Sequence, residues 1–315
     1  MTRRRLVRRT GFHLLRVTAR LAALGGMAGL RRFGDAFGRW HYRLGRTKRR
    51  NLVDQLDRLF SEHPQDETSE QLLREAYRVN DRAILEIMAA YSGAISPADL
   101  AASVAVEGLD ILNAGLAGGR GVVLLGMHSG NGVALAVHLG QLGYPVHVVY
   151  RESNKISPNF FRDGIHSQGL GAIPALPPAT GVRRMLSALK AGEILFILMD
   201  QGSKRGGVPV PFLGKLLQLP PGPVELARRT GAPIIPVLLG AADQQWQFRL
   251  QPPIVTDRSR ELEHEVKIIA DLMQQAIMAD PQFWSWHQRR WYRHSFLADG
   301  APPIASAHAA PTDEI

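Results

Sequence analysis

The spacing of apolar residues changes partway along the chain. In residues 1–92 apolar positions recur at helical spacing, as at Leu52, Leu56 and Leu59, and a polar break over residues 64–68 interrupts them. From residue 104 onward, short apolar runs alternate with helical segments. The first part therefore predicts a layer of helices, and the second predicts a sheet interleaved with helices.

The second part contains four apolar runs that predict buried strands, because a strand covered on both faces shows no polar alternation. These strands are expected over residues 121–126, 146–150, 193–199 and 233–239. A short strand is expected at residues 104–106 and an edge strand at residues 246–250, just before Pro252. Helices are expected over residues 132–142, 180–191, 223–230 and 261–278. This alternation indicates an α/β fold with a mainly parallel or mixed central sheet flanked by helices.

The 315 residues divide into three predicted parts. Residues 1–92 form a basic, membrane-associating helical region, and residues 93–295 form an α/β domain packed with it as one unit. Residues 296–315 lack periodicity and are expected to be a flexible tail.

Charge and cysteine content narrow the classes of partner and chemistry. The chain has 38 lysine and arginine residues against 28 acidic ones, a formal net charge of +10, and many of its arginines lie near the start. A basic surface attracts nucleic acid, an anionic bilayer or an acidic carrier protein, and composition does not choose among them. The absence of cysteine excludes disulfides, cysteine nucleophiles and thiolate metal sites.

The apolar stretch at residues 21–30 is too short to cross a bilayer, which needs about 20 residues. Arg16 and Arg20 before it, with Arg31 and Arg32 after it, disfavour a secretory signal. Two interpretations have equal weight. One is a helix in the membrane interface, with arginines on anionic headgroups. The other is an ordinary amphipathic helix packed on the domain.

His128 occupies a position at which α/β sheets bind ligands. It follows the predicted strand at 121–126, and Ser129, Gly130 and Asn131 then lead into a predicted helix. Ligands of open α/β sheets bind beyond the carboxyl ends of the strands, and a helix N-terminus favours negative charge. An imidazole can take a proton from a hydroxyl while backbone amides hold an oxyanion. We favour this catalytic role over a histidine that only caps a loop.

The segment Gly-Met-His-Ser-Gly-Asn at residues 126–131 resembles the opening of the histidine motif of the late lipid A acyltransferases, the lauroyl and myristoyl transferases, and of related glycolipid acyltransferases. Further similar blocks follow in the same order at residues 199–201 with 206–215, residues 226–236 and residues 281–291. The resemblance implies an acyl transfer from acyl-carrier protein or acyl-coenzyme A to a lipid or glycolipid. It also implies no metal or redox cofactor, no nucleic-acid partner, and a peripheral or monotopic place on the cytoplasmic face of the bacterial inner membrane.

One position departs from the pattern of that family. The family has a carboxylate five positions after the histidine, where this chain has Val133. Losing a carboxylate that orients an imidazole can lower turnover about 10⁴-fold. Asp200 is the first candidate to replace it, because it ends the third predicted strand and should lie on the same sheet edge. Glu152, at the end of the second strand, is the next candidate. The alternative is an inactive relative that binds lipid or acts as a scaffold.

The remaining candidates are predicted to bind substrate. The resemblance suggests that Arg151 and Arg162 hold a phosphate or an acidic group, which suits the guanidinium fork, although a solvated surface would also explain them. Lys204 and Arg205 lie in a glycine-rich loop that can grip a phosphate or be a plain exposed turn. The predicted set is completed by Ser129, Gly130, Asn131, Glu152 and Gln201.

Tryptophans and arginines alternate near the end of the chain. Trp284, Trp286 and Trp291 lie close to Arg289 and Arg290 in the sequence. Such a cluster can stack nucleic-acid bases, lie at a bilayer interface or pack a C-terminal helix. We predict a structural role with contact to the interface.

Overall fold

The structure is a computed structural model that describes residues 3–61, 65–151, 159–176, 178–203, 206–243, 245–287 and 289–297. Three predicted site residues, Glu152, Lys204 and Arg205, lie outside the described residues, as do residues 298–315 of the predicted tail.

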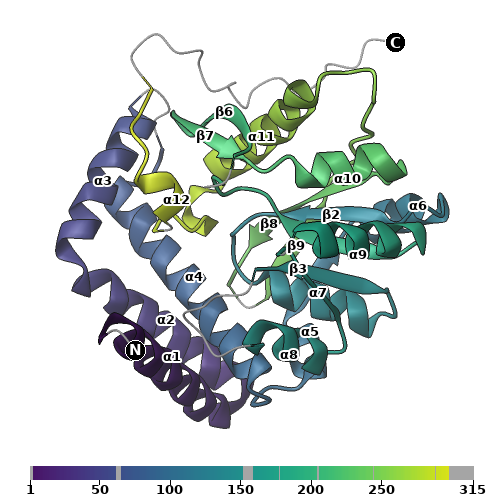
Figure 1. Cartoon of the computed structure of the whole chain (residues 1–315). Helices are drawn as coiled ribbons and strands as arrows, with labels where there is room; N and C mark the ends of the chain where they lie inside the picture. Colours follow the sequence, from purple (N-terminus) through teal and green to yellow (C-terminus); the bar gives the residue numbers. More distant parts are fainter. Residues whose placement is uncertain are drawn as a thin grey trace.

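A seven-stranded sheet lies at the centre of the molecule, in the order β1-β9-β8-β2-β5-β3-β4 (Figure 1). Its strands are β1 (Val104–Glu107), β2 (Val122–Gly126), β3 (Val146–Tyr150), β4 (Gly171–Pro174), β5 (Ile194–Leu198), β8 (Ile234–Ala241) and β9 (Trp246–Leu250). The neighbours from β8 to β4 pair in parallel, whereas β9 is antiparallel to β8 and parallel to β1. The sheet is therefore mixed but mostly parallel, as the sequence predicts.

Four long helices build the N-terminal layer beside this sheet (Figure 1). They are α1 (Arg3–Ala22), α2 (Gly26–Leu44), α3 (Arg46–Phe60) and α4 (Ser69–Tyr91), with a 3₁₀ turn at Ala23–Gly25. A capping box starts α4. The Gln71 backbone N–H donates to the Thr68 side-chain oxygen, and the Thr68 backbone N–H donates to the Gln71 side chain. Against α4, the helix α2 packs closely at Gly34 and Gly38, where an added Cβ would approach Arg82 and Arg78 to 2.9 and 2.6 Å.

The other helices connect or cover the strands. They are α5 (Pro97–Ala101), α6 (Leu109–Ala117), α7 (Gly132–Gln141), α8 (Phe160–Ser167), α9 (Pro178–Lys190), α10 (Gly222–Thr230), α11 (Leu262–Ala279) and α12 (Arg289–Tyr292), with a 3₁₀ turn at Pro281–Phe283. No helix among the residues described here is long and apolar enough to cross a bilayer.

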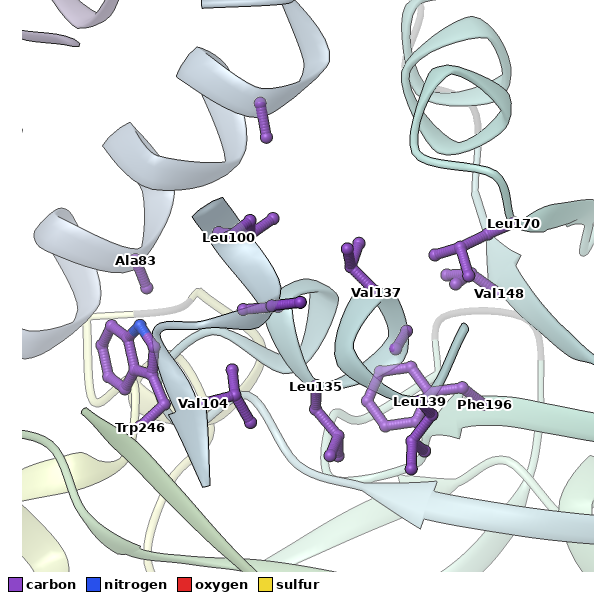
Figure 2. Close-up of a cluster of buried hydrophobic side chains, with 14 of the residues drawn as sticks. Ala83, Leu100, Val104, Leu135, Val137, Leu139, Val148, Leu170, Phe196 and Trp246 are labelled. Carbon is purple, nitrogen blue, oxygen red and sulfur yellow. The ribbon is translucent and has the colours of Figure 1, made fainter. Parts of the chain in front are cut away.

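Each face of the sheet has its own apolar core. Along β2, Val122 and Leu124 pack into the core that includes α7, and Val123 and Leu125 pack into the core that includes α9, α10 and α11. Figure 2 shows part of the first core, with Leu135 of α7, Phe196 of β5 and Trp246 of β9. Burial on both faces explains why the central strands are continuously apolar in sequence.

Two outcomes differ from the sequence expectations. The predicted edge strand at residues 246–250 is wrong in its position, because β9 lies between β1 and β8 and Trp246 is fully buried. Pro252 lies beyond the strand and so leaves its hydrogen bonds intact. The sequence also did not indicate the antiparallel hairpin of β6 (Val208–Phe212) and β7 (Lys215–Leu219), because its Val-Pro-Val-Pro-Phe strand contains two prolines.

The predicted tail begins in contact with this hairpin. Phe296 forms an antiparallel bridge with Lys215, and the Leu297 backbone N–H donates to the Gly214 carbonyl at 2.9 Å.

Candidate active site

The register of two neighbouring strands brings His128 and Asp200 together. Gly126, the last residue of β2, pairs with Leu198, the last residue of β5, and each site residue follows two positions later. Nδ1 of His128 lies 2.7 Å from Oδ1 of Asp200. The structure therefore places the two residues in the contact that the sequence led us to expect, while their catalytic roles remain a prediction.

Asp200 is a buried carboxylate held by three hydrogen-bond donors. Its side chain is buried, and its Oδ2 accepts from the His128 backbone N–H at 2.8 Å and from Trp284 Nε1–H at 2.7 Å. Burial by itself raises the pKa of Asp200, but the charge and hydrogen bonds of His128, together with the Trp284 donor, outweigh it and lower the pKa below its ordinary value. The carboxylate therefore stays ionised and can orient the imidazole.

The C-terminal tryptophan segment holds the His128 loop from the other side. The Ser285 backbone N–H donates to the His128 carbonyl at 3.1 Å, and Ser129 and Trp284 form an antiparallel bridge. Segments far apart in sequence thus fix the backbone on which the imidazole is mounted.

The turn after His128 needs a glycine and an asparagine for distinct reasons. Gly130 has φ +59°, and a Cβ there would come within 2.6 Å of Leu239 and 2.7 Å of Trp246. Asn131 is fully buried, and its Oδ1 accepts from the Ala134 backbone N–H at 3.0 Å, which caps α7. The N-terminus of this ten-residue helix therefore begins beside His128.

This arrangement supports general base catalysis. Because Nδ1 of His128 faces a carboxylate, it carries the proton, and Nε2 can accept a proton from a substrate. The imidazole side chain is 31% exposed, so a substrate can reach it. Backbone amides at the start of α7 supply donors for negative charge that develops on a carbonyl oxygen.

A small apolar cavity lies behind the turn. Glycine, apolar side chains and Ser129 surround it: Gly126, Met127, Ser129, Gly132, Leu135, Phe196, Val237, Leu239 and Phe248. Gly126 and Gly132 both abut the Phe196 ring, since a Cβ at either position would come within 2.9 Å of it. Within the described part of the chain, no group of three or more histidine and acidic residues is placed to hold a metal ion.

The other predicted substrate-binding residues lie around the same sheet edge or further off. Arg151 is exposed directly after β3, and Gln201 is half-buried beside Asp200. Arg162 is exposed on α8, and its Nε donates to Asp163 Oδ1 at 3.0 Å. The structure leaves the binding roles of these three side chains as predictions.

The tryptophan cluster is structural, and its predicted contact with the membrane interface is wrong for the indole rings. Trp284, Trp286 and Trp291 are each at most 2% exposed and pack edge-to-face, with the Trp284 and Trp286 ring centres 4.7 Å apart. Sequence reasoning also missed that Trp284 donates to Asp200. Its only signal was its place in a C-terminal block that resembles the family.

Comparisons with known proteins place this architecture in a family. A sequence model of the bacterial lipid A biosynthesis acyltransferases matches residues 2–293. The phosphatidylinositol mannoside acyltransferase of Mycobacterium tuberculosis (strain ATCC 25618 / H37Rv) is 30% identical over 190 residues, 59% of each chain. That of Mycolicibacterium smegmatis is 29% identical over 187 residues, 58% of this chain and 60% of the relative. The chain thus spans less than two thirds of these relatives. It belongs to the bacterial lipid A biosynthesis acyltransferase family.

Proposed function

We propose that the protein transfers a fatty acyl group from a thioester to a hydroxyl group of a lipid or glycolipid, with His128 as general base and Asp200 as its carboxylate partner. The observation that carries the proposal is the 2.7 Å contact between His128 and Asp200 beside the start of α7. Family membership supports the reaction class.

The proposed reaction has two steps. The acceptor hydroxyl gives its proton to Nε2 of His128 as its oxygen bonds to the thioester carbonyl carbon, and the carbonyl becomes an oxyanion near the α7 amides. The carbon–sulfur bond then breaks, the imidazolium returns the proton to the departing thiolate, and an ester and a free thiol remain. Asp200 stabilises the imidazolium between the two steps.

Val133 lies on the first turn of α7 and packs against the apolar core of that face. With Asp200 already bonded to Nδ1 of His128, the imidazole has a carboxylate partner without an acidic residue at position 133. This contact favours an active transferase over an inactive lipid-binding or scaffolding relative.

The proposed substrate class follows from the relatives and from the family. The similar mycobacterial proteins are named for acylating phosphatidylinositol mannosides, and the family for lipid A biosynthesis, so we propose a glycolipid acceptor with a lipid anchor. The donor is acyl-coenzyme A or acyl-carrier protein.

We also propose that α1 and α2 rest on an anionic bilayer at the cytoplasmic face of the bacterial inner membrane. Exposed apolar side chains recur at helical spacing: Leu14, Val17 and Leu21 on α1, Leu24 in the 3₁₀ turn that follows it, and Trp40 and Leu44 on α2. Exposed arginines accompany them: Arg20, Arg32, Arg39, Arg43, Arg46 and Arg50. Apolar contact combined with positive charge is the requirement for binding an anionic interface.

The test of the reaction uses purified protein with palmitoyl-coenzyme A or palmitoyl-carrier protein and vesicles that contain phosphatidylinositol mannoside or a lipid A precursor. We expect transfer by the wild type and a loss of about 10³-fold or more in kcat for His128→Ala. His166→Ala on α8 is the matched control and should transfer normally. Equal activity of His128→Ala and wild type would remove His128 from the mechanism, and transfer to none of the acceptors would favour the inactive relative.

Vesicle flotation tests the membrane proposal separately. The wild type should float with vesicles containing phosphatidylglycerol and much less with pure phosphatidylcholine, and Leu21→Glu should weaken flotation. Salt-sensitive DNA binding without flotation would instead indicate a nucleic-acid partner.

A further inference from the structure

A second buried carboxylate lies on the far side of the His128 turn. Glu86 of α4 is fully buried and accepts hydrogen bonds from three different elements. Its Oε1 accepts from Arg31 Nε at 3.0 Å, and its Oε2 accepts from Asn131 Nδ2 at 2.9 Å and from Trp246 Nε1–H at 2.6 Å. The three donors come from α2, from the residue that precedes α7 and from β9, so this one carboxylate joins three parts of the fold.

The first consequence concerns the orientation of Asn131. Because its Nδ2 donates to Glu86, its Oδ1 points the other way and accepts from the Ala134 backbone N–H. Glu86 therefore decides which end of the amide caps α7. A reversed amide would place a donor against a backbone N–H and leave the helix uncapped.

The second consequence concerns Gly130, the residue between Ser129 and Asn131. The Trp246 ring packs directly on it, since an added Cβ would lie 2.7 Å from Cζ3 of the indole. The indole is itself held by its hydrogen bond to Glu86 and lies beneath α4 near Ala83 (Figure 2). The Glu86 carboxylate thus holds both the Asn131 side chain, at the end of the turn, and the Trp246 ring that packs on Gly130.

The third partner links this group to the N-terminal helices. Arg31 belongs to α2, and besides its bond to Glu86 its Nη2 donates to the Ser103 carbonyl at 3.3 Å just before β1. The helix that carries part of the proposed membrane surface is therefore joined through Arg31 and Glu86 to the turn beside His128.

We propose that Glu86 is a positioning residue for acyl transfer, which holds the Ser129–Asn131 turn in place and ties it to α2. This inference rests on the proposed function of His128. Within the part of the chain that the structure describes, Glu86 makes no hydrogen bond to Asp200 or to the imidazole, and it acts through Asn131 and Trp246.

The test exchanges the donor and the acceptor. Glu86→Gln and Asn131→Asp each disturb the pairing of one carboxylate with one amide, although aspartate still caps a helix. The double variant restores one carboxylate and one amide in exchanged places. With palmitoyl-coenzyme A and the acceptor vesicles, we expect each single variant to lose about 10-fold or more in kcat with little change in KM, as for a displaced reacting group. The kcat of the double variant should be about five-fold or more above that of the less active single variant.

Glu193→Gln is the matched control, since it removes a carboxylate that bonds a histidine at the opposite edge of the same sheet. It should leave kcat unchanged. The inference would be overturned if the single variants kept wild-type kcat. It would also be overturned if the double variant were folded by thermal unfolding and its loss in kcat were simply the product of the two single losses.

Hydrogen exchange of residues 128–135 supplies a readout that does not need activity. Exchange should be faster in both single variants, closer to wild type in the double variant, and unchanged in Glu193→Gln. If the wild type transfers no acyl group but exchange follows this pattern, the proposed function fails and the positioning of the turn by Glu86 stands. If the wild type is active and the single variants change neither kcat nor exchange, Glu86 has no positioning role. Should one single variant not fold, the other and the double variant still decide.

Discussion

Two histidine–carboxylate pairs with the same contact distance lie at opposite ends of the central parallel strands. At the carboxyl ends of the strands, the carboxyl edge, Nδ1 of His128 lies 2.7 Å from Asp200. At their amino ends, the amino edge, Nε2 of His147 lies 2.7 Å from Glu193. The two carboxylates flank β5, since Glu193 directly precedes this strand and Asp200 lies two positions after its end, and each pair joins β5 to a neighbouring parallel strand. Distance alone therefore does not distinguish a catalytic pair from a structural one.

The surroundings separate the two pairs. The Asp200 side chain is fully buried and takes two further donors, whereas the Glu193 side chain is 31% exposed. In His147 it is Nε2 that binds the Glu193 carboxylate. Its Nδ1 is buried against Gly171, since a Cβ added to Gly171 would lie 2.0 Å from that nitrogen. In His128 it is Nδ1 that meets the carboxylate, so our proposal assigns Nε2 to the substrate, and a helix N-terminus lies beside the residue. A usable base needs a free nitrogen, an ionised partner and a place for the oxyanion.

The largest expected effect comes from Asp200→Asn. The amide cannot hold the imidazole tautomer or stabilise the imidazolium, so kcat should fall about 10³- to 10⁴-fold. Single-turnover and steady-state acyl transfer measure it. If the variant keeps more than a tenth of wild-type kcat, the carboxyl-edge pair is no more catalytic than the pair at the amino edge.

Acid should weaken the carboxyl-edge pair in a defined direction. The pKa of Asp200 is lower in the folded protein than its ordinary value of 3.8, so its contribution to stability is present above that value and is lost as pH falls through the folded pKa. Urea unfolding at pH 6 and pH 3 should show a wild-type loss that exceeds that of Asp200→Asn by about 1 kcal/mol, which is close to the most that one carboxyl with an unfolded pKa of 3.8 can lose at pH 3. Equal losses would show that Asp200 does not gain its partners on folding.

Trp284→Phe sharpens the comparison by removing one donor from Asp200. The ring stays largely filled, but the lost hydrogen bond should raise the pKa of Asp200 toward its ordinary value and lower kcat about 10-fold. The measurement is the pH–rate profile of Trp284→Phe compared with that of Trp291→Phe. The Trp291 indole of the wild type donates to the Leu213 carbonyl rather than to Asp200. A similar fall in both variants would indicate a packing effect rather than the lost donor.

Val133→Glu asks whether the carboxyl edge needs a second carboxylate. Because Asp200 already occupies Nδ1 of His128, we expect no gain in transfer and at most about a three-fold loss in kcat from placing a charge in a half-buried site. A clear rise in kcat would instead show that Asp200 is an incomplete partner.

Glu193→Gln should have the smallest effect. A partly exposed pair of this kind contributes at most about 1 kcal/mol, so thermal unfolding should shift little and kcat should match wild type. A loss of activity comparable to that of Trp284→Phe would erase the functional distinction between the two edges.

Much of the sheet could be predicted because its strands are buried on both faces. The apolar runs at β2, β3 and β5 each matched an observed strand to within two residues, and α7 and α11 followed from helical periodicity. The hairpin of β6 and β7 could not be predicted, since its prolines disfavour a strand unless the pairing is already known. The interior place of β9 depends on its pairing with β1, about 140 residues earlier.

The site divides in the same way. Sequence order alone indicated that His128 and Asp200 follow strands of one parallel sheet, which limits where their side chains can lie. It did not indicate Trp284 as a donor to Asp200, or Glu86 as a partner of Asn131, because these contacts join residues 84 and 45 positions apart.

By itself, the sequence determined the α/β class, the strand ends that carry His128 and Asp200, and the basic N-terminal helices, because hydrophobic period and charge are local properties. Only the tertiary structure decided that Asp200 reaches the imidazole, that the tryptophans are buried, and that Glu86 supports the turn. Those outcomes depend on strand register and helix packing between distant segments, and a hydrogen bond exists only when both partners are brought within about 3 Å.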